Sequence, residues 1–206
     1  MENKEIFLDL TKTKNLINYT VNSNNRLILH VLDIFNANTK NEINIKLKKG
    51  AQVNVLLSSF AKPKLNKFFN FNFEHLEDDA ESSFDSYLVA THLASINVKI
   101  VSIIKPKTTN NKTSQKIKGV LLSNSSTIHG EPQLIIDDNN VKAKHAMAVG
   151  QIDPKQIFYL MSRGIKKSQA IQLILMGFFK TTLKIINDEK LMLNYLKKIQ
   201  NLFKER

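Results

Sequence analysis

The feature that most constrains this chain is the alternation of apolar and polar side chains from about Ile6 to Val149. The clearest stretches are Ile43–Leu47, Val53–Leu57 and Phe69–Phe73, where every second residue is apolar. A period of two places all the apolar side chains on one face of a half-buried strand. We therefore predict a mainly β region. The same pattern continues in three further segments: Val98–Ile104, Val120–Leu122 and Gln133–Ile136.

Small polar corners separate these strands, and they leave the sheet arrangement open. They include Lys49-Gly50-Ala51, Asp78-Asp79-Ala80, Ser123–Ser126 and Asp138-Asn139-Asn140, and they follow no strict period. Such corners suit a β-sandwich and also a parallel β-helix, whose coils stack on one another. The polar segment Pro106–Lys118, rich in Thr, Asn and Lys, is interpreted as a long exposed excursion between strands.

After Gly150 the pattern becomes helical, which divides the chain into a β domain over residues 1–150 and a helical domain over 151–206. Asp153 followed by Pro154 is typical of a helix start. Arg163-Gly164 is typical of its end, because glycine readily takes the left-handed conformation. Ser168 is predicted to cap a second helix and Asp188 a third. Helices this short must dock on another surface to be stable.

Composition excludes several classes of function. The chain has no cysteine, so it forms no disulfide and offers no thiolate to a metal or an iron–sulfur cluster. No phosphate-binding loop, dinucleotide fingerprint or nucleophile–base pair is recognisable, so we expect a protein that is not an enzyme. Its start, Met1–Leu10, is acidic and lacks a long apolar core, and the apolar run Ala170–Phe179 is too short to span a bilayer. We therefore expect a cytoplasmic chain without a membrane association.

The net charge of +12 raises the question of nucleic-acid binding. Of the 30 basic residues 27 are Lys, whereas Arg is the side chain suited to bidentate phosphate and base contacts. Lys and Asn are both abundant and spread along the chain, as in proteins from A+T-rich genomes. We interpret most of this charge as solvated surface, with a nucleic-acid-binding β protein as the weakest of the alternatives.

Two consecutive runs and the helix after them carry a resemblance to a known family. They are Pro132–Asp138, Val141–Asp153 and Gln156–Ile165, followed by Ala170 and Gly177-Phe178. In order and spacing these segments resemble the SufB/SufD family, the scaffold subunits of the SUF machinery for iron–sulfur cluster assembly, and they are closer to its SufD-type members. The resemblance is sharp from about Gln115 to Phe179 and extends back to about Asn41.

This resemblance implies a right-handed parallel β-helix followed by a small C-terminal helical domain. It also implies a scaffold that works by association with a SufB-type subunit through the β-helix, and with a SufC-type ATPase through the C-terminal helices. ATP-driven dimerisation of that ATPase would then rearrange the paired β-helices. No cofactor would be bound tightly by this chain alone, and an iron–sulfur cluster would be held only transiently, shared with a partner.

The chain departs from the family pattern where thiols are expected. The SufD-type pattern usually has cysteine two residues before the histidine, and Ala143 stands there. Ser126 stands nearest to the position of a SufB-type cysteine, and Ala146 replaces the SufB-type glutamate. The SufB-type chemistry is therefore missing, which leaves the role of a complementary subunit without a thiol.

The candidate site residues follow from the resemblance. His145 is the candidate for the cluster-assembly interface, as a shared ligand and not as a metal site by itself, since neutral imidazole is a competent iron ligand. Its alternative is a structural strand histidine. Tyr159 and Arg163 are the candidates for docking the ATPase, and Phe158 is expected instead to pack the helical domain onto the β-helix. His129, with Asp137 and Asp138, shows no recognised ligand spacing.

The alternative from another class is a degenerate β-helical adaptor, or a homodimeric interaction protein, that keeps the fold without any cluster chemistry. The absence of cysteine at Ala143 is its signature. The end coils of a β-helix expose unpaired backbone groups, so dimerisation is expected in either case.

Overall fold

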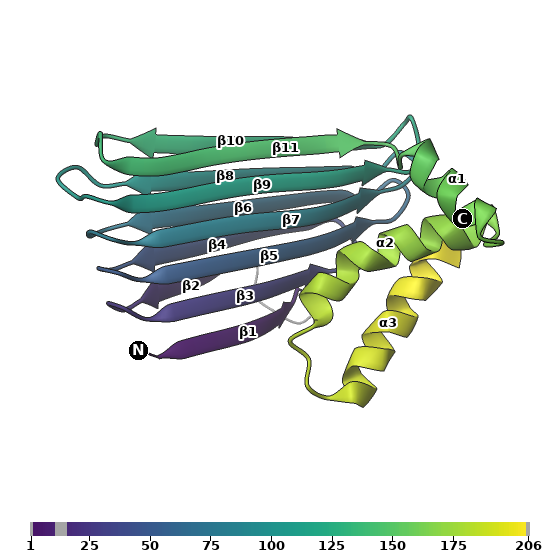
Figure 1. The fold of residues 1–206 in the computed structure, drawn as a ribbon, viewed down its shortest axis with the longest axis horizontal. Helices are drawn as coiled ribbons and strands as arrows, with labels where there is room; N and C mark the ends of the chain where they lie inside the picture. Colours follow the sequence, from purple (N-terminus) through teal and green to yellow (C-terminus); the bar gives the residue numbers. More distant parts are fainter. Residues whose placement is uncertain (1, 11–15, 205–206) are drawn as a thin grey trace.

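The computed structural model describes residues 2–10 and 16–204, which form two facing parallel sheets followed by three helices (Figure 1). One sheet has the strand order β1-β3-β5-β7-β9-β11 and the other the order β10-β8-β6-β4-β2. The strands of the first sheet are β1 (Asn3–Asp9), β3 (Arg26–Asp33), β5 (Gln52–Ala61), β7 (Glu81–Ala90), β9 (Asn111–Leu121) and β11 (Val141–Gly150). Those of the second are β2 (Leu16–Val21), β4 (Thr39–Leu47), β6 (Asn66–His75), β8 (Ser95–Ile104) and β10 (Thr127–Ile136).

Successive strands of the chain belong to alternate sheets, and every pairing is parallel. The chain therefore winds as a solenoid in which each strand bonds to the equivalent strand of the next coil. This is a parallel β-helix, so the fold class is confirmed and the β-sandwich alternative is wrong. Five of the six segments predicted as strands from alternation lie within strands, and the sixth, Val120–Leu122, extends one residue past the end of β9.

The corners stack as the strands do. Asn24, Gly50, Asp79 and Asn110 all have positive φ, between 56° and 64°, and lie in the turns before β3, β5, β7 and β9. Each amide in this row donates to the carbonyl of the residue before the next corner, as Gly50 N does to Asp78 O at 2.9 Å. Successive coils thus turn at a residue with the same left-handed backbone conformation, which keeps their strands in register.

The core lies between the two sheets and is mostly apolar. A typical column stacks Leu29, Val55 and Phe84 from β3, β5 and β7 in direct register. Across the interior Phe84 meets Phe71 of β6 with ring centroids 4.7 Å apart. Because strands such as β4, β5, β6 and β7 bury alternate residues over much of their length, apolar alternation is the sequence signal of this core.

The segment Pro106–Lys118 is the exception, and its interpretation as an exposed excursion is wrong. Residues 111–118 belong to β9, which lies between β7 and β11 in the first sheet. Its inward side chains Asn111, Thr113 and Gln115 are polar but buried, at 0–3% exposure. Polar inward residues hide the apolar alternation by which the other strands are recognised.

Three helices follow the β-helix and lie on the side where the strands of the first sheet end (Figure 1): α1 (Pro154–Ser162), α2 (Lys167–Leu183) and α3 (Glu189–Lys204). A second apolar cluster joins Leu175 and Phe179 of α2 and Ile199 of α3 to Leu32 and Phe60 at the ends of β3 and β5. No helix within the described ranges is long and apolar enough to cross a membrane.

Two buried hydrogen bonds fix the helices on the strands. The hydroxyls of Ser58 in β5 and Thr182 in α2 lie 2.6 Å apart. Tyr195 of α3 donates to Asp9 at the end of β1 over 2.6 Å, and burial together with this carboxylate raises the pKa of the Tyr195 phenol well above its ordinary value. The helical domain is therefore tied to both β1 and β5.

The helix ends agree with the sequence at three places and differ at one. Asp153 accepts from Lys155 N at 2.9 Å, Asp188 accepts from Leu191 N at 3.0 Å, and Gly164 has a φ of 84° just after α1. These caps are confirmed. Ser168 is not a cap: α2 starts one residue earlier, after Lys166, whose extended backbone holds the N-cap position without a side-chain bond.

Candidate functional site

The last coil, formed by β10 and β11, is an open end of the β-helix. Among the described strands, β10 pairs only with β8 and β11 only with β9, so each leaves one edge unpaired (Figure 1). The side chains here are more exposed than in earlier coils, including Ile135 at 52% and Met147 at 44%. Unpaired strand edges beside exposed apolar side chains are suited to association with another chain.

His145 lies in this last coil, in the middle of β11. It is in register with Gln115 of β9, which is in register with Phe84 of β7, so the three side chains belong to one inward-facing column. His145 is exposed because no further coil covers it. Among the described residues it has no hydrogen bond or ion pair, so both ring nitrogens are free to bind another group.

A chain of buried polar side chains lies beneath the last coil. The hydroxyl of Ser82 is 2.9 Å from that of Thr113, which donates to Ser102 at 2.9 Å. Gln115 also donates to Ser102, at 2.8 Å. His75 joins the other end of the chain through Ser82, at 2.8 Å.

His75 is buried and hydrogen-bonded, whereas His145 is exposed. Its second ring nitrogen is 3.2 Å from Asn111 Oδ1, and the side chain is fully buried. Burial lowers the pKa of His75 below its ordinary value of 6.5, and the hydrogen bond to Asn111 opposes this only in part. His75 is therefore a neutral, structural member of the buried chain.

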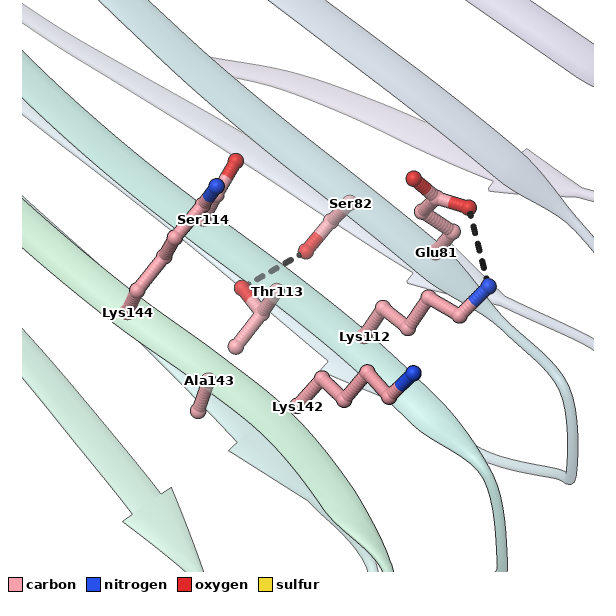
Figure 2. A pocket seen from close by; sticks show the side chains of 8 residues that line it. All are labelled: Glu81, Ser82, Lys112, Thr113, Ser114, Lys142, Ala143 and Lys144. Carbon is pink, nitrogen blue, oxygen red and sulfur yellow. Dashed lines mark hydrogen bonds and ion pairs between the residues drawn. The ribbon is translucent and has the colours of Figure 1, made fainter.

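A hollow of about 370 Å³ is lined by residues of β7, β9 and β11, near the start of β11 (Figure 2). Three register rows line it, and the middle row stacks Ser82, Thr113 and Ala143. The row before it stacks Glu81, Lys112 and Lys142, and the row after it adds Ser114 and Lys144.

The hollow carries an excess of positive charge. In Figure 2 Lys112 and Lys142 extend in the same direction, and Lys112 Nζ lies 3.9 Å from Glu81 Oε2. Lys142 and Lys144 are exposed and form no ion pair with the described residues. Three ammonium groups against one carboxylate favour anionic groups at this place.

Ser126 lies apart from this hollow. It occupies the corner before β10, whereas Ala143 lies near the start of β11, at the opposite end of the coil because β10 and β11 run in opposite directions (Figure 1). Ser126 is buried and donates to Ser123 O over 2.7 Å, as a corner residue. The two positions where thiols were expected are therefore not brought together within this chain.

His129 also stays outside any metal constellation. It is exposed on β10, and the described residues contain no group of three His, Asp or Glu side chains that could hold a metal ion. A cluster at His145 would accordingly need ligands from outside this chain.

The first helix places Tyr159 and Arg163 on the surface. Tyr159 is 57% exposed, and Arg163 lies over its ring at 5.3 Å and donates to its hydroxyl at 3.2 Å. Phe158 is 72% exposed, so the expectation that it packs the helical domain is wrong. The partly buried face of α1 belongs to Ile157 and Leu160, and Phe158 projects away from it.

Reasoning from the sequence missed Gln115, the residue below His145. It lies in the segment that was interpreted as an excursion. The available signal was its spacing, since Asn111, Thr113 and Gln115 alternate with Lys112, Ser114 and Lys116 as strand residues do.

Comparison with known proteins shows which family this chain resembles. A family model described as "SUF system FeS cluster assembly, SufBD core domain" matches residues 13–178, which is most of the chain. The iron–sulfur cluster assembly protein SufD of Bacillus subtilis is 44% identical over 64 residues, which are 31% of this chain and 15% of that protein. The SufD protein of Escherichia coli is 38% identical over 80 residues, 39% of this chain and 19% of that protein.

A third relative extends the comparison. The iron–sulfur cluster assembly SufBD family protein of Archaeoglobus fulgidus is 42% identical over 67 residues, 32% of this chain and 18% of that protein. The matched part thus spans less than a fifth of the length of each of these three relatives.

Proposed function

We start from the premise that this chain belongs to the SufBD core family of the SUF system for iron–sulfur cluster assembly, and we propose that it acts there as a SufD-like scaffold subunit. In this proposal it catalyses no reaction alone. It works in the cytoplasm, bound to a SufB-type subunit and a SufC-type ATPase, and the nascent cluster is its cargo.

The observation that carries the proposal is the exposure of His145 at the open end of the β-helix. An inward-facing residue of a middle coil would be buried, whereas His145 has no partner among the described residues and lies between two unpaired strand edges. A second β-helix that pairs with β10 or β11 would cover His145 and bring its own ligands to it. Neutral imidazole can then share a cluster with thiolates, as it does in other iron–sulfur centres.

Two surfaces serve the two partners in this proposal. The β10–β11 edge takes the SufB-type subunit or a second copy of this chain, because unpaired backbone groups are satisfied by another strand. The exposed pair Tyr159 and Arg163 on α1, with Phe158 beside them, takes the ATPase. Large aromatic and arginine side chains of this kind are the usual anchors of protein interfaces.

The connection between α1 and β11 supports a mechanical link between these surfaces. Only Gln151, Ile152 and Asp153 separate the end of β11 from the start of α1. A displacement of α1 by the ATPase would therefore act directly on the strand that carries His145. Because α2 and α3 are anchored to β5 and β1 by Ser58–Thr182 and Tyr195–Asp9, the rest of the β-helix would resist the same displacement.

The second candidate function is an adaptor that binds partners without handling a cluster. The residue at Ala143 favours it, because alanine offers no ligand where the family pattern usually has cysteine. The two candidates differ in one respect: only the scaffold needs the imidazole of His145.

The test is cluster formation in the complex reconstituted with SufB-type and SufC-type subunits, comparing His145→Ala with His129→Ala. Both histidines are exposed on the last coil, so the second variant controls for the loss of a surface imidazole. We expect His145→Ala to lower the iron and sulfide content while the complex still assembles, and His129→Ala to leave it unchanged. Equal cluster content in the two variants would favour the adaptor.

A further inference from the structure

Gln115 is the buried neighbour of His145 along the stack of coils. It is 2% exposed, and its Cα is the register partner of the Cα of His145. Neighbouring strands lie about 4.8 Å apart, so inward side chains of adjacent coils come into contact. The part of the Gln115 side chain that faces the last coil therefore faces His145.

The orientation of the Gln115 amide is determined by the groups around it. Nε2 donates to Ser102 Oγ at 2.8 Å and to the main-chain oxygen of Gln133 at 3.1 Å. A flipped amide would place its oxygen against the Gln133 carbonyl, and two acceptors repel each other. Thr113 donates to the same Ser102 hydroxyl, so the anchor itself is held in place.

The oxygen of this amide remains unused. Gln115 Oε1 is buried and has no hydrogen-bond partner among the described residues. A buried acceptor without a donor is unusual in folded proteins, and His145 offers an N–H that has no partner either. An unused acceptor and an unused donor therefore belong to residues that are register partners on neighbouring strands.

We propose that Gln115 is a positioning residue for His145: its Oε1 accepts a hydrogen bond from one imidazole N–H and thereby fixes the ring and its tautomer. This inference rests on the function proposed for His145. With one nitrogen held as N–H, the other keeps its lone pair and points toward the open end, which is the form of histidine that can ligate a metal. The buried chain of Ser102 and Thr113 supports the arrangement from below.

The direct test is the tautomer of His145, observed by nitrogen-15 NMR of the full-length protein labelled at histidine and kept above pH 8. The variant is Gln115→Met, which keeps the length of the side chain and removes the acceptor. The matched control is Gln133→Met, because that side chain bonds to Glu131 while its main-chain oxygen remains in place. The His145→Ala protein assigns the signal.

We expect one tautomer to dominate in the wild type and in Gln133→Met. In Gln115→Met the ratio of the two should move toward that of free histidine by about fivefold, the equilibrium equivalent of one neutral hydrogen bond. An unchanged ratio in Gln115→Met overturns the proposal, as does a wild-type His145 that populates both tautomers as free histidine does. Should Gln115→Met not fold, Gln115→Asn retracts the carbonyl by one methylene and is expected to give the same shift.

Cluster formation separates this inference from the function on which it rests. If the tautomer shifts in Gln115→Met and cluster content falls by about 10-fold or more, as for other residues that orient metal ligands, both hold. If the tautomer shifts while His145→Ala leaves cluster content intact, Gln115 orients His145 but the proposed function fails. If His145→Ala abolishes the cluster and Gln115→Met changes neither readout, the function stands and the positioning role is overturned.

Discussion

The ion pair between Lys67 and Asp33 leads to the sharpest prediction about stability. Both side chains are fully buried, and Lys67 Nζ lies 2.9 Å from Asp33 Oδ1. Lys67 also donates to Phe35 O at 2.6 Å, and Asp33 accepts from Phe35 N and from the Thr39 hydroxyl, both at 3.0 Å. Burial lowers the pKa of Lys67, and the charge of Asp33 opposes that shift. The pair holds the corner between β3 and β4 in place.

Lys67→Met removes the cation and leaves the Asp33 carboxylate buried, with only two donors. An uncompensated buried charge of this kind costs about 3–5 kcal/mol of unfolding free energy. Lys46→Met is the matched control: it breaks an ion pair to Glu74 that spans 3.9 Å and is half exposed, and such pairs contribute at most about 1 kcal/mol. The double variant Lys67→Met/Asp33→Asn removes both charges while Asn still accepts from Phe35 N, so it should regain most of the loss.

The assay is unfolding in urea, with the free energy in water taken from midpoint and slope. The slope should stay constant, because the fold is unchanged. A loss below about 1 kcal/mol in Lys67→Met, or a double variant no more stable than Lys67→Met, would refute the reasoning, since either result means that the Asp33 charge is solvated or otherwise compensated.

Three further predictions concern the helical domain, the buried histidine and the cationic hollow. Phe179→Ala should cost about 3–5 kcal/mol of unfolding free energy, because Phe179 is fully buried between the β-helix and the helices. Phe158→Ala should cost less than about 0.5 kcal/mol, because Phe158 is exposed on α1. Similar urea midpoints for the two variants would contradict the docking of the helices on the β-helix. Because the pKa of His75 is lowered in the folded state, the unfolded chain binds a proton first as pH falls below 6.5. Stability should then decline by up to about 1.4 kcal/mol per pH unit until the folded pKa is reached, and His75→Gln should flatten that dependence; an unchanged slope between pH 7.5 and 5.5 would count against it. Ala143→Cys should create a thiol with a pKa below the ordinary 8.5, because Lys142 and its lysine neighbours favour the thiolate; the pH dependence of its alkylation measures this, and a pKa of 8.5 or more would show that the lysines do not act there.

Most of the fold was predictable because its core is made by alternation. Val53–Leu57 and Phe69–Phe73 each bury every second residue, and both are strands. Alternation alone does not distinguish a parallel β-helix from a sandwich, since both bury one face of each strand. That choice came from the resemblance carried by Val141–Asp153 and its neighbours.

The failures have a common physical origin in polar or exposed residues that depart from the simple pattern. The first part of β9 was missed because Asn111, Thr113 and Gln115 form hydrogen bonds inside the core with polar side chains of other strands, among them His75 and Ser102, and so replace apolar side chains. Gln115 was missed with it. Phe158 was assigned to packing by its size alone, although its position in α1 opposes the partly buried residues Ile157 and Leu160.

The site itself was predictable only in part. His145 was found through the resemblance, and its exposure follows from its place in the last coil. The cationic hollow around Ala143 depends on three strands that are distant in sequence and adjacent in space, so it required the register of β7, β9 and β11.

The central claim is that this chain acts as a scaffold bound to the other SUF subunits. The most direct test is an anaerobic affinity purification of the tagged chain from its own cell, with protein identification by mass spectrometry and with iron and sulfide analysis. The account predicts recovery of a SufC-type ATPase and a SufB-type subunit together with iron and sulfide, none of which an unrelated tagged protein retains. A self-associated, iron-free chain without either subunit would contradict it.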